Sequence, residues 1–166
     1  VERVRSYAKG TRSERVSSEV SELVNKAVRE FKRQSGERVE VWVPQEQPVY
    51  IIVNPLEFEL VIINLLRNAA QALQELGVLN PKVALTIKRE DNKALIAIED
   101  NGHIEKEKIE KLSEPTNSTK ADGLGLGLQI VRSIIENHGG KIFFSQAASG
   151  GLRVEIRLPA EETTEQ

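Results

Sequence analysis

The chain has 166 residues, 39% of them hydrophobic and 29% charged, with a formal net charge of −2, as expected for one globular domain with its own core. Acidic and basic residues are mixed along its length, so no nucleic-acid surface is predicted, and no apolar run is long enough to cross a membrane. The absence of cysteine excludes disulfides and thiolate chemistry, and two histidines are too few for a multi-histidine zinc site.

The N-terminal part of the chain predicts one amphipathic helix. Residues Val1–Arg15 are polar and basic and show little periodicity. Apolar residues then recur on one face over Val20–Phe31, which predicts a helix. Ser17 or Ser18 is its expected N-cap, and Gly36 follows its end.

Two strands and a clearly bounded second helix follow. Valines at alternate positions predict a half-buried strand over Val39–Val43, and a second short strand covers Tyr50–Val53. The segment Asn54–Glu57 has asparagine at the cap position, proline at the first helical position and glutamate three residues after the cap. The helix that it starts is predicted to reach about Leu76 and to stop at Gly77.

The second half of the chain predicts a hairpin, a long polar segment and a third helix. The hairpin strands cover about Val83–Lys88 and Ala94–Glu99. The polar stretch Asn101–Asp122 is of a length typical of functional lids or disordered segments. A helix over about Leu124–Asn137 then leads into the last part of the chain.

Two final strands, Ile142–Ser145 and Leu152–Leu158, complete the predicted domain. The order is helix, strands, helix, hairpin, lid, helix and hairpin. It predicts an α+β fold, a two-layer α/β sandwich in which a mixed sheet is covered on one face by about three helices.

Two asparagines on the second predicted helix are candidate ligands for a metal and for phosphate. Asn64 and Asn68 are four residues apart and therefore share one helix face. An amide oxygen is a hard, neutral ligand for Mg²⁺, which takes phosphate oxygens and water as its other ligands. A pair of solvated surface amides is the alternative explanation.

A carboxylate and a glycine follow the end of the strand that contains Ala94–Glu99. Asp100 could accept a hydrogen bond from the exocyclic amine of adenine, which guanine could not supply at the same place. Gly102 would allow a flat base to approach the backbone. A simple Asp-Asn-Gly turn is the alternative.

Glycines at alternate positions, Gly123, Gly125 and Gly127, begin the third predicted helix. Free amides at a helix N-terminus bind phosphate, although the spacing is neither that of a P-loop nor that of a dinucleotide-binding motif. A flexible hinge is the alternative. Lys120, which follows Thr119 just before these glycines, could close over phosphates as a mobile charge.

The order and spacing of these segments resemble the Bergerat-type ATP site of histidine kinases, DNA gyrase, heat-shock chaperone ATPases and mismatch-repair ATPases. The strings NLLRNAAQAL, EDNG, GLGLGLQIV and ENHGGKI resemble the catalytic and ATP-binding domain of sensor histidine kinases in particular, over about Ser18–Pro159. The resemblance implies the Bergerat fold, with ATP and Mg²⁺ as ligands.

Site residues are implied by the same resemblance. Asn68 is implied to be the Mg²⁺ ligand, Asn64 to lie beside the phosphates and Asp100 to bind adenine. Asn64, Asn68 and Lys120 are implied to be catalytic. The residues implied to contact nucleotide are Asn64, Asn68, Asp100, Gly102, Thr119, Lys120, Gly123, Leu124, Gly125, Leu126 and Gly127.

The resemblance implies a protein histidine kinase of a two-component system. It would donate the γ-phosphate of ATP to a histidine on a dimerisation and phosphoacceptor domain, with a response regulator as an indirect partner. Hydrolytic relatives carry a glutamate base where this chain has Asn64, so transfer is expected rather than hydrolysis. Residues 1–17 would be the end of the dimerisation helix or a linker, 18–160 the ATP-binding catalytic domain and 161–166 a polar tail.

The chain has no methionine, and we expect it to be part of a longer protein. Neither His103 nor His138 resembles the phosphoacceptor, so the chain alone should bind ATP or ADP without phosphorylating itself. The full-length protein is expected to be a membrane-linked homodimer, and this part of it soluble and cytoplasmic. Two alternatives stay open, an anti-sigma-type serine kinase and a degenerate nucleotide-binding module without turnover, to which the lid sequence and Gln71 point.

Overall fold

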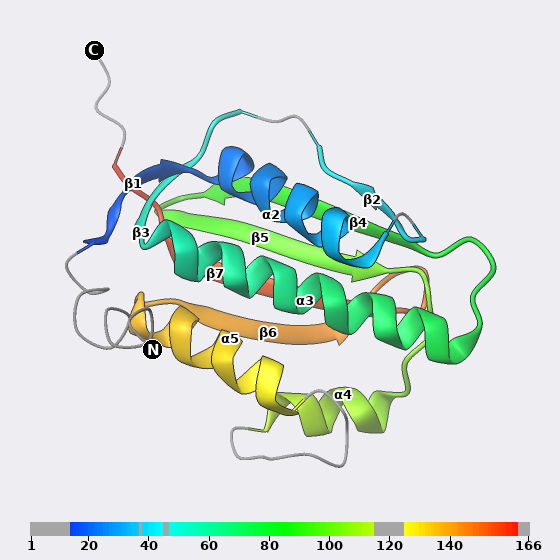
Figure 1. The fold of residues 1–166 in the computed structure, drawn as a ribbon. Coiled ribbons are helices and arrows are strands. Elements are labelled where there is room, and N and C mark those ends of the chain that lie inside the picture. The colour runs from blue at the N-terminus through cyan, green and yellow to red at the C-terminus, as the bar shows by residue number, and fades with distance from the viewer. Residues whose placement is uncertain (1–13, 37, 45–46, 115–124, 163–166) are drawn as a thin grey trace.

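The computed structural model describes residues 14–36, 38–44, 47–114 and 125–162. The strands are β1 (Val16–Glu19), β2 (Glu40–Trp42), β3 (Tyr50–Val53), β4 (Lys82–Glu90), β5 (Lys93–Asp100), β6 (Lys141–Gln146) and β7 (Leu152–Pro159). The helices are α2 (Val20–Ser35), α3 (Pro55–Leu76), α4 (Lys106–Ser113) and α5 (Gly125–Asn137). These elements form one sandwich of helices on a sheet (Figure 1).

The main sheet has five strands in the order β2-β4-β5-β7-β6. Strand β2 is parallel to β4, and the other neighbours are antiparallel. Helices α2, α3 and α5 lie on one face of this sheet (Figure 1). The fold is therefore the predicted α+β two-layer sandwich with a mixed sheet.

The hydrophobic core lies between the helices and the inward face of the three central strands. Alternate residues of these strands point to the helices because side chains alternate between the faces of a sheet. The buried strand residues of the core are Val83, Leu85, Ile87, Ala94, Ile96, Ile98, Val154, Ile156 and Leu158. Helix α3 packs against α2 on one side and α5 on the other, so it is the central helix of the layer.

The start of helix α2 differs from the prediction. Ser17 and Ser18 lie in strand β1, where they pair with β3 in an antiparallel two-stranded sheet. The cap is instead Glu19, whose carboxylate accepts hydrogen bonds from the backbone N–H groups of Ser21 and Glu22. The predicted serine cap was wrong because the extended pairing of β1 keeps both serines out of the helix.

Glu161, which follows β7, contacts both strands of the small sheet, β1 and β3. The Ser17 hydroxyl donates to the Glu161 carboxylate at 2.5 Å, and the Glu161 N–H donates to the carbonyl of Tyr50 at 2.7 Å. Strand β1 therefore extends across the predicted boundary at residues 17 and 18. The division of the chain into linker, domain and tail stays a prediction.

Helix α3 has the predicted ends. Its cap residue Asn54 accepts a hydrogen bond from the N–H of Glu57 at 3.0 Å, and Pro55 occupies the first turn. At the other end Gly77 adopts the left-handed conformation with φ of 69°, which glycine reaches without strain. This 22-residue helix carries both asparagines of interest in register along one face.

The polar stretch predicted as a lid contains a helix that the sequence analysis missed. Helix α4 has only two apolar residues, Ile109 and Leu112, spaced three apart, and Leu112 is buried. The contact of α4 with β6 stabilises the short helix, because a helix of this length is marginal in isolation. Residues 115–124, which include Thr119, Lys120, Gly123 and Leu124, lie outside the described residues.

None of the helices in the described part of the chain combines the length and the apolarity needed to cross a membrane.

Candidate functional site

A cavity of about 300 Å³ lies between α3, α4, α5 and the ends of β5 and β7. Its walls are mostly apolar and carry a few polar side chains, which is typical of small-molecule sites. Two of the predicted site residues, Asn68 and Asp100, lie in its lining. The other lining residues are Leu65, Ala69, Ala72, Glu75, Leu76, Ile98, His103, Ile104, Glu105, Lys108, Leu112, Leu128, Phe144, Leu152 and Val154.

Asp100 is a buried carboxylate at the end of β5, held by backbone groups on one oxygen only. Its Oδ1 accepts the N–H of Gly102 at 2.9 Å and that of Leu152 at 3.4 Å. Burial raises the pKa of Asp100, and the two backbone hydrogen bonds partly offset this rise. Within the described part of the chain Oδ2 accepts no hydrogen bond, so the cavity-lining carboxylate keeps a free acceptor for a ligand.

Two glycines allow the close packing around this carboxylate. A Cβ on Gly151 would lie 2.2 Å from the Asp100 carbonyl oxygen and 2.3 Å from its Oδ1, so any other residue here would force the surrounding backbone to shift. A Cβ on Gly102 would lie 3.0 Å from Leu73 and 3.1 Å from Leu76 of α3. The space left by Gly102 is thus occupied by helix α3, and its predicted contact with a nucleotide base stays a prediction.

The two asparagines of α3 converge on the first turn of α5. A Cβ on Gly127 would lie 3.5 Å from Asn64 Oδ1 and 3.9 Å from Asn68 Oδ1. Asn64 Nδ2 is buried and has no hydrogen-bond partner among the described residues. A buried amide without a partner is costly, so this atom is suited to bind an acceptor on a ligand.

The first turn of α5 supplies backbone donors next to these amides. The helix begins at Gly125, and Gly125, Leu126 and Gly127 are its first three residues. The N–H groups of a first turn have no partner within their own helix, and the helix dipole favours a negative charge there. Asn64, Asn68 and the start of α5 therefore form a polar group at one end of the site. Asp100, at the end of β5, lines the same cavity as Asn68.

An arginine that the sequence analysis did not consider supports the wall of the cavity. The Arg132 guanidinium of α5 donates a hydrogen bond to the carbonyl of Leu112 in α4. The same group lies over the ring of Phe144 in β6, 5.3 Å from its centre. Leu112 and Phe144 both line the cavity, so Arg132 connects three of the elements that bound it.

The two histidines have contrasting surroundings. His138 is buried, its Nδ1–H donates to the carbonyl of Ile134 at 2.8 Å, and its Nε2 accepts the N–H of Asn54 at 3.2 Å. Both ring nitrogens are therefore engaged, as expected for a structural histidine. His103 is exposed beside Glu105, with 3.2 Å between Nε2 and Oε2, and lines the cavity.

The apolar walls were not predicted as site residues. Leu65, Ile98, Leu128 and Val154 come from four different elements and are ordinary core residues in the sequence. Only their tertiary arrangement makes them a binding surface. The pair Gly150-Gly151 in the last hairpin was the one available signal, because adjacent glycines often mark a close backbone approach.

Comparison with known proteins shows the family to which the fold belongs. Residues 53–162 match the family model described as Histidine kinase-, DNA gyrase B-, and HSP90-like ATPase. Sensor protein TdiS of Thauera aromatica is 38% identical over 110 residues, which are 63% of this chain and 20% of TdiS. Sporulation kinase B of Bacillus subtilis is 34% identical over 125 residues, which are 74% of this chain and 28% of that kinase.

Solved structures extend the similarity to the whole fold. The catalytic domain of histidine kinase ThkA has a TM-score of 0.72 and 27% identity, over 88% of this chain and 95% of that domain. The histidine kinase domain of the osmosensor EnvZ of E. coli has a TM-score of 0.64 and 25% identity, over 91% of this chain and 92% of that domain.

The chain spans less than a third of the length of TdiS and of sporulation kinase B, and it corresponds to nearly the whole of the ThkA domain. The family model covers most of it, including Asn64, Asn68, Asp100 and the start of α5. This chain belongs to the Histidine kinase-, DNA gyrase B-, and HSP90-like ATPase family and has the fold of a catalytic, ATP-binding domain of a sensor histidine kinase.

Proposed function

We propose that this domain binds ATP with Mg²⁺ in the cavity between α3, α4 and α5, and that it donates the γ-phosphate to a histidine on a dimerisation and phosphoacceptor domain. One observation carries the proposal. A buried carboxylate, Asp100, and an amide, Asn68, line the same cavity, and Asn68 lies beside the start of α5. The carboxylate suits the base of a nucleotide, and the amide beside the helix start suits its phosphates and their metal ion.

Asp100 recognises adenine in this proposal. Its Oδ2 is an acceptor without a partner among the described residues, and the exocyclic amine of adenine is a donor of matching geometry. Guanine carries an oxygen at that position, which the carboxylate would repel. Apolar side chains such as Ile98 and Leu128 would cover the faces of the base.

The phosphates bind at the other end, in this proposal, against α3 and α5. Gly125, Leu126 and Gly127 begin helix α5, and the N–H groups of a first turn have no partner within their own helix, so they would donate to phosphate oxygens. Asn64 Nδ2 would donate to a phosphate oxygen, which would satisfy a buried group that otherwise has no partner. Thr119, Lys120, Gly123 and Leu124 are proposed to complete this end from the segment outside the described residues.

Asn68 is the proposed protein ligand of Mg²⁺. Its side-chain oxygen is a hard, neutral donor near the helix start, and Mg²⁺ commonly takes one or two protein ligands together with phosphate oxygens and water. When bound, the ion would offset the charge that develops on the phosphate oxygens during transfer.

Transfer is favoured over hydrolysis because of the residue at position 64. An amide has no basic group that could take a proton from water. Asn64 is the α3 side chain nearest to the position of a Cβ on Gly127, at 3.5 Å, compared with 3.9 Å for Asn68. The residues of this domain would therefore position the phosphoryl group, and the nucleophile would come from another domain. His138 cannot serve, because it is buried and both of its nitrogens are engaged.

The partners follow from the same proposal. We infer that the longer protein is a membrane-linked homodimer whose phosphoacceptor histidine receives the phosphoryl group and passes it to a response regulator. The names of the relatives, sensor proteins and histidine kinases, support this assignment, and the chain spans only a part of them.

The proposal is tested by calorimetric titration with ADP and with a non-hydrolysable ATP analogue, each with and without Mg²⁺. We expect binding of both, with higher affinity when Mg²⁺ is present. Radiolabelled ATP should then label a dimerisation domain supplied in trans from TdiS or sporulation kinase B, and should not label this chain alone. Absence of nucleotide binding would refute the site, and binding without transfer to any supplied domain would favour a module without turnover.

A further inference from the structure

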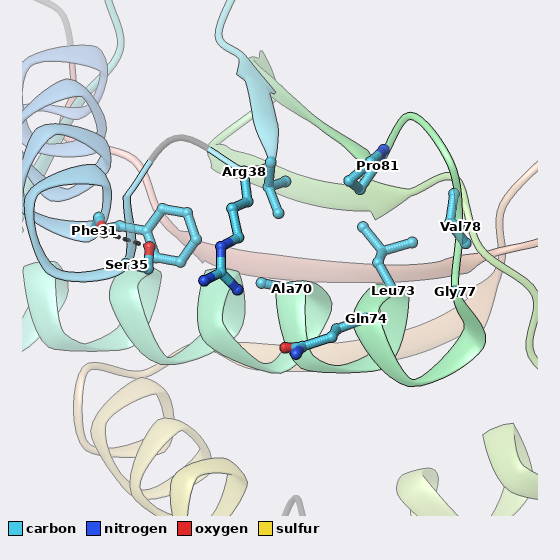
Figure 2. Close-up of a pocket in the computed structure, with 10 residues that line it drawn as sticks. Phe31, Ser35, Arg38, Ala70, Leu73, Gln74, Gly77, Val78 and Pro81 are labelled. Atoms are coloured by element: carbon cyan, nitrogen blue, oxygen red, sulfur yellow. Dashed lines mark hydrogen bonds between the residues drawn. The ribbon is translucent and has the colours of Figure 1, made fainter.

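A second cavity, of about 320 Å³, is lined by residues on the face of α3 opposite to the one that lines the nucleotide site. Figure 2 shows the residues that line this second cavity. Its lining comes from the second half of α2, from Arg38 and Val39, from the second half of α3 and from the loop that joins α3 to β4. Its lining residues are Phe31, Ser35, Arg38, Val39, Ala70, Leu73, Gln74, Gly77, Val78 and Pro81. No carboxylate is among these lining residues.

The walls of this second cavity are apolar and include deeply buried side chains. Phe31 and Leu73 are each no more than 2% exposed, and Val39, Val78 and Pro81 complete the apolar lining. The volume is at the lower end of the range for small-molecule sites, so it suits a ligand of about the size of one ring. Such a ligand would bury its apolar body against these residues.

Arg38 gives the second cavity its only charge among the described lining residues. Figure 2 shows the Arg38 side chain directed toward helix α3, on which Ala70 and Gln74 are labelled. Within the described part of the chain Arg38 makes no hydrogen bond and no ion pair. Arg33, five residues earlier in the last turn of α2, is instead paired with Glu30 at 2.6 Å.

We propose that this second cavity is a binding site for a compact carboxylate with an apolar body, such as an aromatic or branched-chain acid. The guanidinium group of Arg38 presents paired N–H donors that match the two oxygens of a carboxylate. The apolar walls take the rest of the ligand, and none of the described residues that line the cavity is acidic. This site is independent of the proposed function of the domain.

The second cavity is also connected to the adenine end of the nucleotide site. Leu73 lines it and lies 3.0 Å from the position that a Cβ of Gly102 would take. The loop after α3 is tied to Asn101, whose Nδ2 donates to the carbonyl of Asn80 and whose Oδ1 accepts the N–H of Lys82, both at 2.9 Å. Asn101 is the residue between Asp100 and Gly102.

A carboxylate bound against Leu73 and the α3–β4 loop would therefore hold the segment that carries Asp100 in the arrangement seen here. We expect it to raise the affinity for ADP, and ADP should raise the affinity for the carboxylate by the same factor, because binding linkage is reciprocal. This coupling rests on the proposed nucleotide site, whereas binding of the carboxylate does not.

The test uses benzoate as the probe and its neutral isostere benzamide as the matched ligand, with binding followed by two-dimensional NMR of the labelled protein. Benzoate should shift the amide signals of Val39, Leu73 and Val78 in a saturable way, and benzamide should bind about tenfold or more weakly, because it lacks the charge that Arg38 recognises. Arg38→Gln should weaken benzoate binding by about the same factor. Arg33→Gln, on the same flank but outside the cavity, should leave it unchanged.

Three results would overturn the proposed carboxylate site: no saturable shift with benzoate, equal binding of benzoate and benzamide, or unchanged benzoate binding in the Arg38→Gln variant. Arg38 is exposed, so its replacement should leave the fold intact. Titration of ADP with and without saturating benzoate tests the coupling, and an unchanged ADP affinity would refute it. Failure of ADP to bind in either condition would instead count against the proposed function, while the NMR result would still decide the second site.

Discussion

Replacement of Asp100 by asparagine removes the charge proposed to select adenine and changes little else. The amide oxygen of asparagine can still accept the N–H groups of Gly102 and Leu152, which Asp100 Oδ1 accepts at 2.9 Å and 3.4 Å. The group facing the ligand becomes an NH₂ donor opposite the amine of the base. Loss of a hydrogen bond to a charged group is worth about 1.5–3 kcal/mol, so the affinity for ADP should fall by about tenfold or more.

The same substitution should not destabilise the ligand-free protein. Burial raises the pKa of Asp100 above its ordinary value of 3.8, so the folded protein favours the protonated carboxyl. The stability that this preference contributes is present below the unfolded-state pKa and is lost as the pH rises through the raised folded pKa. Asparagine does not titrate, so the melting temperature of the variant minus that of the wild type should become more positive as the pH rises above about 4.

Calorimetry with ADP and thermal unfolding over this pH range measure the two effects separately. Glu99→Gln is the matched control, because Glu99 is the preceding residue on β5, points to the other face of the sheet and pairs with Arg153 at 2.6 Å. It should leave ADP affinity unchanged. An Asp100→Asn variant that binds ADP with wild-type affinity would refute the role of this carboxylate.

Three further substitutions test other parts of the site. Asn68→Ala should abolish the enhancement of ATP binding by Mg²⁺ with the fold intact, as seen in titrations with and without the ion. Gly151→Ala would force a Cβ to within 2.2 Å of the Asp100 carbonyl oxygen, and chemical denaturation should show a loss of about 1–3 kcal/mol in the free energy of unfolding. Arg132→Ala removes the contact with Phe144 and the hydrogen bond to Leu112, and calorimetry should show ADP affinity reduced about fivefold, equivalent to about 1 kcal/mol.

Two matched controls accompany these variants. Gln71→Ala changes an exposed amide on the same helix as Asn68, and it should keep the full effect of Mg²⁺. Arg157→Ala removes an arginine that lies over Phe143, 4.7 Å from its centre, outside the cavity, and it should keep normal ADP affinity. Normal Mg²⁺ enhancement in the Asn68 variant, wild-type stability of the Gly151 variant or unchanged ADP affinity of the Arg132 variant would each contradict the role assigned to that residue.

The elements with strong local signals were predicted correctly from the sequence. Helix α3 has both a side-chain cap at Asn54 and a left-handed glycine at Gly77, and its observed bounds, Pro55–Leu76, agree with the prediction. The alternating valines around β2 are half-buried as expected. In these segments the local preference of the chain and its tertiary packing favour the same structure.

The predictions failed where distant contacts decide the local structure. Strand β1 exists because Val16–Glu19 pairs with β3, and nothing in its four residues excludes the start of a helix there. Helix α4 depends on one buried leucine, Leu112, whose carbonyl accepts a hydrogen bond from Arg132 twenty residues later in the chain. Such contacts have no signal in a local sequence window.

The candidate site was predicted in part for the same reason. Asn64, Asn68 and Asp100 were proposed as site residues because polar residues on a helix face and at a strand end require an explanation, and their roles stay a prediction. The carboxylate also depends on Gly151 and on the N–H of Leu152, which come from the last hairpin and are brought to it only by the pairing of β5 with β7.

The most direct test of the proposed site is a crystal structure of the domain grown with Mg²⁺ and a non-hydrolysable ATP analogue. We expect the exocyclic amine of adenine within hydrogen-bonding distance of Asp100 Oδ2, the phosphates against Asn64 and the start of α5, and Mg²⁺ bound by Asn68. A nucleotide bound elsewhere, or bound here with its phosphates at Asp100 and its base beside the two asparagines, would contradict the proposed site.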